Sequence, residues 1–129
     1  MILILLFFAG IGFSVSAQET EENEDIGGVY GTHCGIAGQQ PQFRVKIEEW
    51  ISQEKVAEIN EWLNSENKVK NVYAAEAFIR LHNSKKVTLN SRQLAKIREL
   101  KSSSEEIFSC SGCVHSLKTM KEALQEFNL

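Results

Sequence analysis

Apolar residues recur at the spacing of an α-helix along much of the chain after residue 42. In three segments they lie three or four positions apart, which places them on one face of a helix. The three sets are Phe43, Ile47, Trp50 and Ile51; Val56, Ile59, Trp62 and Leu63; and Leu94, Ile97 and Leu100. We therefore predict three amphipathic helices whose apolar stripes, including both tryptophans, belong to the core.

Residues 69–82 form the most apolar stretch of this region and include three alanines. A helix that is apolar on several faces is normally the most buried one, so we expect this segment to be the central helix. Glu76 lies within it, and we expect an ion pair with Arg44 or Arg80 to compensate its burial. His82 ends the segment, where we expect it to interact with the helix C-terminus rather than to act as a base.

The C-terminal part of the chain also has helical signals. Asn90 and Gln93 stand at the spacing of a capping box and introduce the segment that contains Leu94. Serines before two glutamates predict a short helical turn over residues 105–108. A last amphipathic helix is predicted from Leu117, Met120, Leu124 and Phe127. Only residues 86–89 resemble a strand, so the predicted fold class is all-α.

The first 42 residues have a different character. Residues 2–13 are apolar or glycine without a charge, and small residues follow up to Ala17, which is typical of a secretory signal. This stretch is shorter than the roughly 20 apolar residues of a membrane-spanning helix. Residues 18–42 contain five acids, five glycines and the one proline. We predict a signal peptide (1–17), a flexible acidic and glycine-rich arm (18–42) and an all-α domain (43–129) that is secreted or periplasmic, without a stable membrane anchor after cleavage.

Composition and charge narrow the choice of partners. The chain has 129 residues, of which 43% are hydrophobic and 24% charged, as in ordinary globular proteins. The formal net charge is −3, and the five acids between residues 19 and 25 account for more than all of it. The remainder is only weakly basic, so we expect no nucleic-acid partner.

A weak internal repeat points to paired helices. Residues 56–62 match residues 94–100 at a constant offset of 38. Helix pairs with a period near 40 are typical of HEAT and armadillo repeats, although a small antiparallel bundle would give the same local match. Three segments look like parts of small exported bacterial proteins of uncharacterised function: Trp62-Leu63-Asn64-Ser65, Tyr73-Ala74-Ala75-Glu76-Ala77-Phe78-Ile79-Arg80-Leu81 and Cys110-Ser111-Gly112-Cys113. The resemblance covers about residues 43–129 and implies HEAT-like helix pairs, with no catalytic residues to transfer.

The three cysteines allow several kinds of chemistry. In an oxidising compartment, Cys34 can pair with Cys110 or Cys113 and attach the arm to the domain, or Cys110 and Cys113 can pair with each other. A bond from Cys34 would close a long loop, worth about 4 kcal/mol on the chain-entropy account. We favour a disulfide, and we expect the Cys110–Cys113 segment to be a structural junction that positions the last helix.

Metal binding and redox catalysis are the alternatives. Cys34, Cys110, Cys113 and His115, with His33 nearby, are residue types that bind zinc. A Cys-x-x-Cys pair ahead of the last predicted helix would have a lowered thiol pKa, as in dithiol oxidoreductases. However, the βαβ pattern of thioredoxin-like folds is absent from the sequence.

The sequence contains no serine–histidine–acid set, phosphate-binding loop or H-E-x-x-H motif. We therefore predict neither catalytic residues nor a cofactor, with zinc as the lesser alternative. The expected function is a protein-interaction or structural module with an unidentified protein or peptide partner. A thiol-redox or metal-binding protein that uses Cys110-x-x-Cys113 is the alternative.

Overall fold

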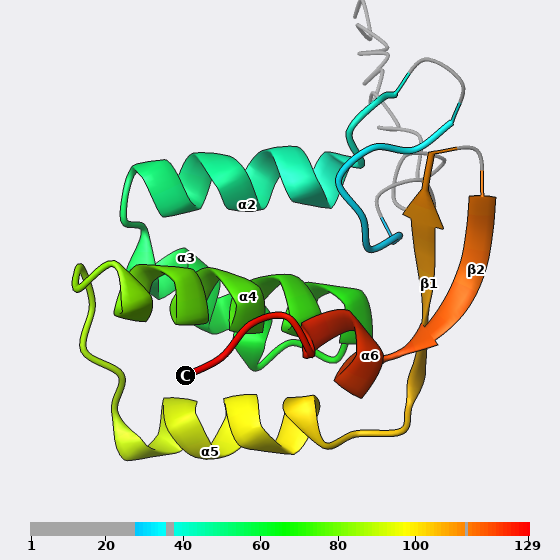
Figure 1. The fold of residues 1–129 in the computed structure, drawn as a ribbon. Coiled ribbons are helices and arrows are strands. Elements are labelled where there is room, and N and C mark those ends of the chain that lie inside the picture. Colours follow the sequence, from blue (N-terminus) through cyan, green and yellow to red (C-terminus); the bar gives the residue numbers. More distant parts are fainter. Residues whose placement is uncertain (1–27, 36–37, 113) are drawn as a thin grey trace, which may run out of the picture.

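The computed structural model describes residues 28–35, 38–112 and 114–129. Within these ranges the chain forms helices and one two-stranded antiparallel sheet (Figure 1). The predicted signal peptide and the acidic part of the arm lie outside the described residues. The elements are α2 (Gln42–Ser52), α3 (Val56–Leu63), α4 (Lys68–Asn83), α5 (Ser91–Lys101), β1 (Glu106–Ser111), β2 (Val114–Thr119) and α6 (Met120–Leu124).

Helix α4 is the centre of the molecule, as predicted. Eleven of its 16 residues are buried, and it lies between α2 and α5 in Figure 1. It packs against α2, α3, α5, α6 and β1. The amphipathic helices on either side turn their apolar stripes towards it, so Ile47, Ile59 and Ile97 are fully buried. Trp50 is buried and Trp62 packs against the core, which confirms their predicted place.

Local capping signals fix the ends of two helices. The side chain of Asn90 accepts a hydrogen bond from the backbone of Gln93, and the Gln93 side chain accepts one from the backbone of Asn90. This is the capping box predicted for α5. Asn67 begins α4 in a similar way, since its side chain accepts a hydrogen bond from the backbone N–H of Lys70.

The prediction of an all-α fold is wrong, because residues 106–119 form a β-hairpin. Strands β1 and β2 pair in register from Glu106 opposite Thr119 to Ser111 opposite Val114, which makes the fold mixed α/β. Residues 105–108 are therefore not a helical turn. The predicted last helix is also wrong: Leu117 belongs to β2, and α6 begins only at Met120.

The physical reason is that a hairpin forms through pairs between distant residues, which helical spacing in one segment does not reveal. The apolar residues assigned to the predicted last helix stand three or four positions apart, as in a helix, although they belong to two different elements. The matched repeat segments do form α3 and α5, but the second is followed by the hairpin instead of another helix. Residues 86–89, the one strand candidate, are irregular.

The described part of the arm runs beside β1. Tyr30 bridges to Ser109 and Cys34 bridges to Gly112, both in parallel orientation. Strand β1 therefore lies between the arm and β2, and β2 is at the outside of the molecule (Figure 1).

Candidate functional site

A buried ion pair joins α2 to α4. Glu76 on α4 is 1% exposed and Arg44 on α2 is 3% exposed. Two guanidinium nitrogens of Arg44 donate to the two carboxylate oxygens of Glu76, at 2.5 and 2.9 Å. Burial opposes the charge of Arg44, but its hydrogen bonds to Glu76 and the opposite charge outweigh burial and raise the pKa of Arg44. The predicted ion pair of Glu76 is confirmed.

A second pair extends this contact towards the surface. Arg80 donates to both carboxylate oxygens of Glu48, at 2.6 and 3.0 Å, and to Glu76 at 3.1 Å. These hydrogen bonds hold the pKa of Glu48 below its usual value. Arg44 also donates to Glu48. We call these four residues the ionic cluster; two positive and two negative side chains alternate in it and cancel in charge.

Two tyrosines connect the arm with helix α4. The Tyr30 hydroxyl donates to Glu76 at 2.5 Å, and the Tyr73 hydroxyl donates to the carbonyl of Val29 at 2.7 Å. Burial raises the pKa of Tyr73 to about 12, and burial together with the Glu76 charge raises the pKa of Tyr30 further. Both phenols therefore keep their protons at neutral pH and act as donors.

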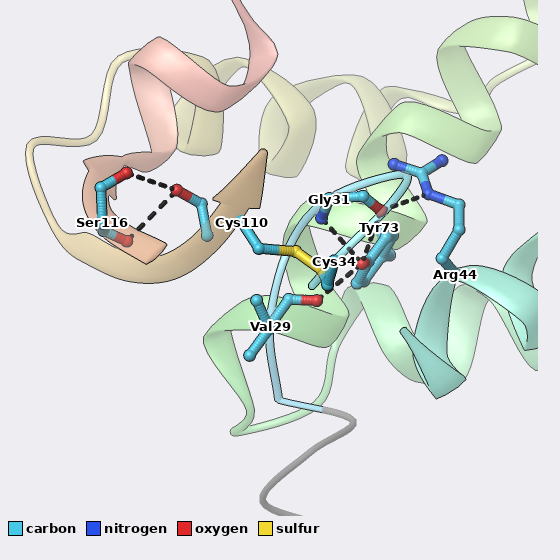
Figure 2. Close-up of a disulfide and its surroundings, with 8 residues drawn as sticks. Val29, Gly31, Cys34, Arg44, Tyr73, Cys110 and Ser116 are labelled. Carbon is cyan, nitrogen blue, oxygen red and sulfur yellow. Dashed lines mark hydrogen bonds between the residues drawn. A yellow bond between two sulfur atoms is a disulfide. The ribbon is translucent and has the colours of Figure 1, made fainter. Parts of the chain in front are cut away.

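Arg44 contributes a third connection to the arm. Its Nε donates to the carbonyl of Gly31 at 2.9 Å, and its guanidinium lies 4.8 Å from the centre of the Tyr73 ring. Figure 2 shows the guanidinium and the tyrosine hydroxyl converging on the backbone around Gly31.

The ionic cluster forms the floor of a cleft of about 460 Å³ between the arm, α2, the hairpin and the chain after α6. Lys118, Glu122 and Glu126 are among the residues on its walls. Every buried side-chain polar atom of the ionic cluster has a hydrogen-bond partner, and among the side chains in the described part of the chain only His82 Nδ1 is buried without one. His82 lies in the last turn of α4. The ionic cluster is thus a satisfied support for the surrounding elements.

Cys34 and Cys110 form a disulfide between the arm and β1 (Figure 2). Their Cα atoms are 5.5 Å apart and they are separated by 76 positions in the sequence. The prediction of a cysteine pair that attaches the arm to the domain is confirmed for these two residues. Cys113 lies outside the described residues.

The position of Cys110 changes the interpretation of the Cys-x-x-Cys motif. Cys110 lies in β1 and Gly112, with φ +58°, lies between the two strands. Cys110 and Ser111 therefore belong to a hairpin, and the prediction that the motif leads directly into the last helix is wrong. Because α6 begins only at Met120, a lowering of the thiol pKa by a helix N-terminus is no longer expected.

The predicted zinc ligands do not gather into a site within the described residues. Cys34 and Cys110 are bonded to each other, while His33 and His115 are exposed. No group of three or more histidine, cysteine, aspartate or glutamate residues in the described ranges is arranged to hold a metal ion.

Within residues 28–35, 38–112 and 114–129, no segment pairs with the outer edge of β2. The arm bonds to β1 through the backbone of Phe108 and Cys110, so the intervening residues of β1 direct their backbone groups towards β2. In an antiparallel pair, the backbone groups of successive residues point alternately towards the partner strand and away from it. His115, Leu117 and Thr119 therefore direct their N–H and C=O groups away from β1. Among the described residues, no backbone partner bonds to these groups.

Exposed apolar side chains lie beside this edge. Phe108 and Leu117 stand directly opposite each other in the hairpin and are 66% and 54% exposed. They project from the face of the hairpin opposite to buried Ile107. The sequence interpretation missed this surface. The one sequence signal that indicates it is Gly112, which directly follows β1.

Comparison with known proteins does not assign this chain to a family. No family model, curated protein or solved structure matches the chain. Within the described ranges, no helix has the length and apolar character needed to cross a bilayer. The candidate sites are therefore defined by two features of the molecule itself, the polar cleft and the open edge of β2.

Proposed function

We propose that this chain is a secreted or periplasmic protein-interaction module that binds its partner at the exposed side of the β1–β2 hairpin. The observation that carries the proposal is the open edge of β2 beside Phe108 and Leu117. An unpaired strand edge offers a row of backbone donors and acceptors to an extended partner segment. The apolar pair next to it supplies surface that is buried when the partner binds.

The rest of the fold supports this role by holding the hairpin in place. Ile107 anchors β1 in the core, and the disulfide of Cys110 ties the same strand to the arm. The hydroxyl of Ser109 donates to the carbonyl of Ser116 on β2 at 3.2 Å. A surface that is already ordered loses less conformational freedom when it binds.

The leader sequence and the disulfide support the proposed compartment. Residues 1–17 have the pattern of a secretory signal, and the Cys34–Cys110 pair is compatible with an oxidising environment. The resemblance to small exported proteins agrees with the same proposal.

Site-specific photo-crosslinking in the native host tests the proposed surface. We expect a photoreactive phenylalanine analogue at Leu117 to give a crosslinked adduct of discrete mass. The same analogue at Ala95, an exposed position on α5, serves as the control and is expected to give none. The substitution Phe108→Ser should reduce the adduct from position 117. Equal labelling at both positions, or no adduct at position 117, would overturn the proposal.

A further inference from the structure

We infer that the partner at this surface is a second copy of the chain, joined through antiparallel pairing of the two β2 strands across a two-fold axis. The inference rests on the proposed function and names its partner. The inference is carried by the open strand edge that His115, Leu117 and Thr119 form. Exposed Phe108 lies beside this edge.

The pattern of β2 is complementary to itself in one register. If the two-fold axis passes beside Leu117, this residue stands opposite its own copy, and His115 stands opposite Thr119 of the second copy. These are the residues whose backbone groups face outwards, so each of them gains hydrogen bonds to the second strand. A closed two-fold pairing uses the same patch on both copies and leaves no edge for further addition on β2.

The side chains also fit this register. Lys118 stands opposite Ser116 of the second copy, so the pairing opposes no two like charges. Natural edge strands avoid association through proline, bulges, short length or charged side chains, lysine above all. Strand β2 has no proline and pairs with β1 in unbroken register, and its one charged residue, Lys118, would stand opposite a serine in the dimer.

Pairing would also bring the exposed Leu117 side chains of the two copies together. Phe108 and Leu117 lie on the same face, so the two copies together would form one continuous apolar strip across the joined sheet. The contact is short, because β2 has six residues. Interfaces well below about 1,200 Å² are usually weak. We therefore expect a dimer that dissociates on dilution, with a dissociation constant on the order of micromolar.

Sedimentation equilibrium of the full mature chain over a wide concentration range tests the inference. We expect the average mass to rise from that of a monomer towards twice that value. Leu117→Lys places two positive charges opposite each other at the two-fold axis and should keep the protein monomeric. Val45→Lys, which changes an exposed apolar residue on α2, is the matched control and should dimerise like the wild type.

The residue opposite Lys118 tests the register. Ser116→Glu should tighten the dimer by roughly threefold or more, and Ser116→Lys should weaken it by a similar factor, because each contact occurs twice across the axis. Circular dichroism of all variants establishes that they are folded.

A wild-type protein that stays monomeric at millimolar concentration would overturn the inference, as would a Leu117→Lys variant that dimerises normally. In either case, a crosslinked adduct of a different mass from position 117 would leave the proposed interaction surface standing. Absence of every adduct would instead defeat the proposed function itself.

Discussion

At the scale of single residues, Glu76 is the group on which most of the buried polar contacts converge. It accepts hydrogen bonds from Arg44, Arg80 and Tyr30. Each of these donors comes from a different place in the sequence: α2, α4 itself and the arm. The loss of its carboxylate charge would therefore leave the buried guanidinium of Arg44 with only the partly exposed Glu48 as a counter-charge.

We predict that Glu76→Gln lowers the free energy of unfolding by about 3–5 kcal/mol, the usual effect of removing one partner of a buried pair. Urea denaturation measures the change. Glu61→Gln, at an exposed position on α3, is the control and should alter stability by less than about 0.5 kcal/mol. Equal stability of both variants would show that the Arg44–Glu76 pair does not stabilise the fold.

Glu48 leads to a pH-dependent prediction. Its pKa in the folded protein is lower than the 4.5 of an unperturbed glutamate, chiefly through hydrogen bonds from Arg80. The resulting stabilisation is fully present above the unfolded pKa and is lost as the pH falls through the lower, folded pKa. Glu48→Gln should therefore be less stable than the wild type at pH 7, and the difference should shrink below about pH 4.5. Thermal melts from pH 7 to pH 3 measure this difference; a gap that stays constant would contradict the prediction.

At the scale of elements, the hairpin depends on the turn that joins its strands. Gly112 has φ +58°, the left-handed region that residues with a Cβ atom occupy at a cost of about 1–2 kcal/mol. A Cβ atom at this position would meet no other atom within 4 Å. Any effect of a small substitution is thus conformational rather than steric.

Gly112→Ala should destabilise the protein by about 1 kcal/mol, and Gly112→Asn should destabilise it less, because asparagine tolerates the left-handed conformation. Chemical denaturation of the two variants against the wild type gives the comparison. If alanine and asparagine had the same effect, the left-handed conformation would not be the source of the loss.

The elements also show what the sequence can and cannot reveal. Helices α2 to α5 follow from local spacing and caps such as Asn90, because their hydrogen bonds lie within one segment. Burial of Glu76 was predictable because it stands among apolar residues in the central helix. Cys110 and Phe108 were placed wrongly, since a strand acquires its partners from elsewhere in the chain. The open edge of β2 results from the pairing of β1 with β2, so the local sequence pattern could not predict it either.

At the scale of the whole molecule, the disulfide joins the arm, near the start of the described chain, to β1 in its C-terminal part. It spans 76 positions, and on the chain-entropy account a loop of this length stabilises the folded state by about 4 kcal/mol. The ionic cluster and the two tyrosines act between the same arm and the helices. The arm is therefore attached both by a covalent bond and by hydrogen bonds.

We predict that a phosphine reductant lowers the denaturation midpoint of the wild type but not that of the Cys34→Ser, Cys110→Ser double variant, which lacks this bond from the start. Both reduced proteins should unfold at similar urea concentrations. Limited proteolysis should cleave the arm first in each of them. Unchanged wild-type stability after complete reduction would contradict the prediction.

The parallel pairing of the arm with β1 also has a consequence for the order of synthesis. A ribosome makes the arm among the first segments and the hairpin among the last. Until Cys110 emerges, the thiol of Cys34 has no partner in β1, and Tyr30 has no strand beside it. Covalent attachment of the arm must therefore be a late event of biogenesis, and a nascent chain that stops before residue 106 would hold the arm only through its polar contacts with α2 and α4.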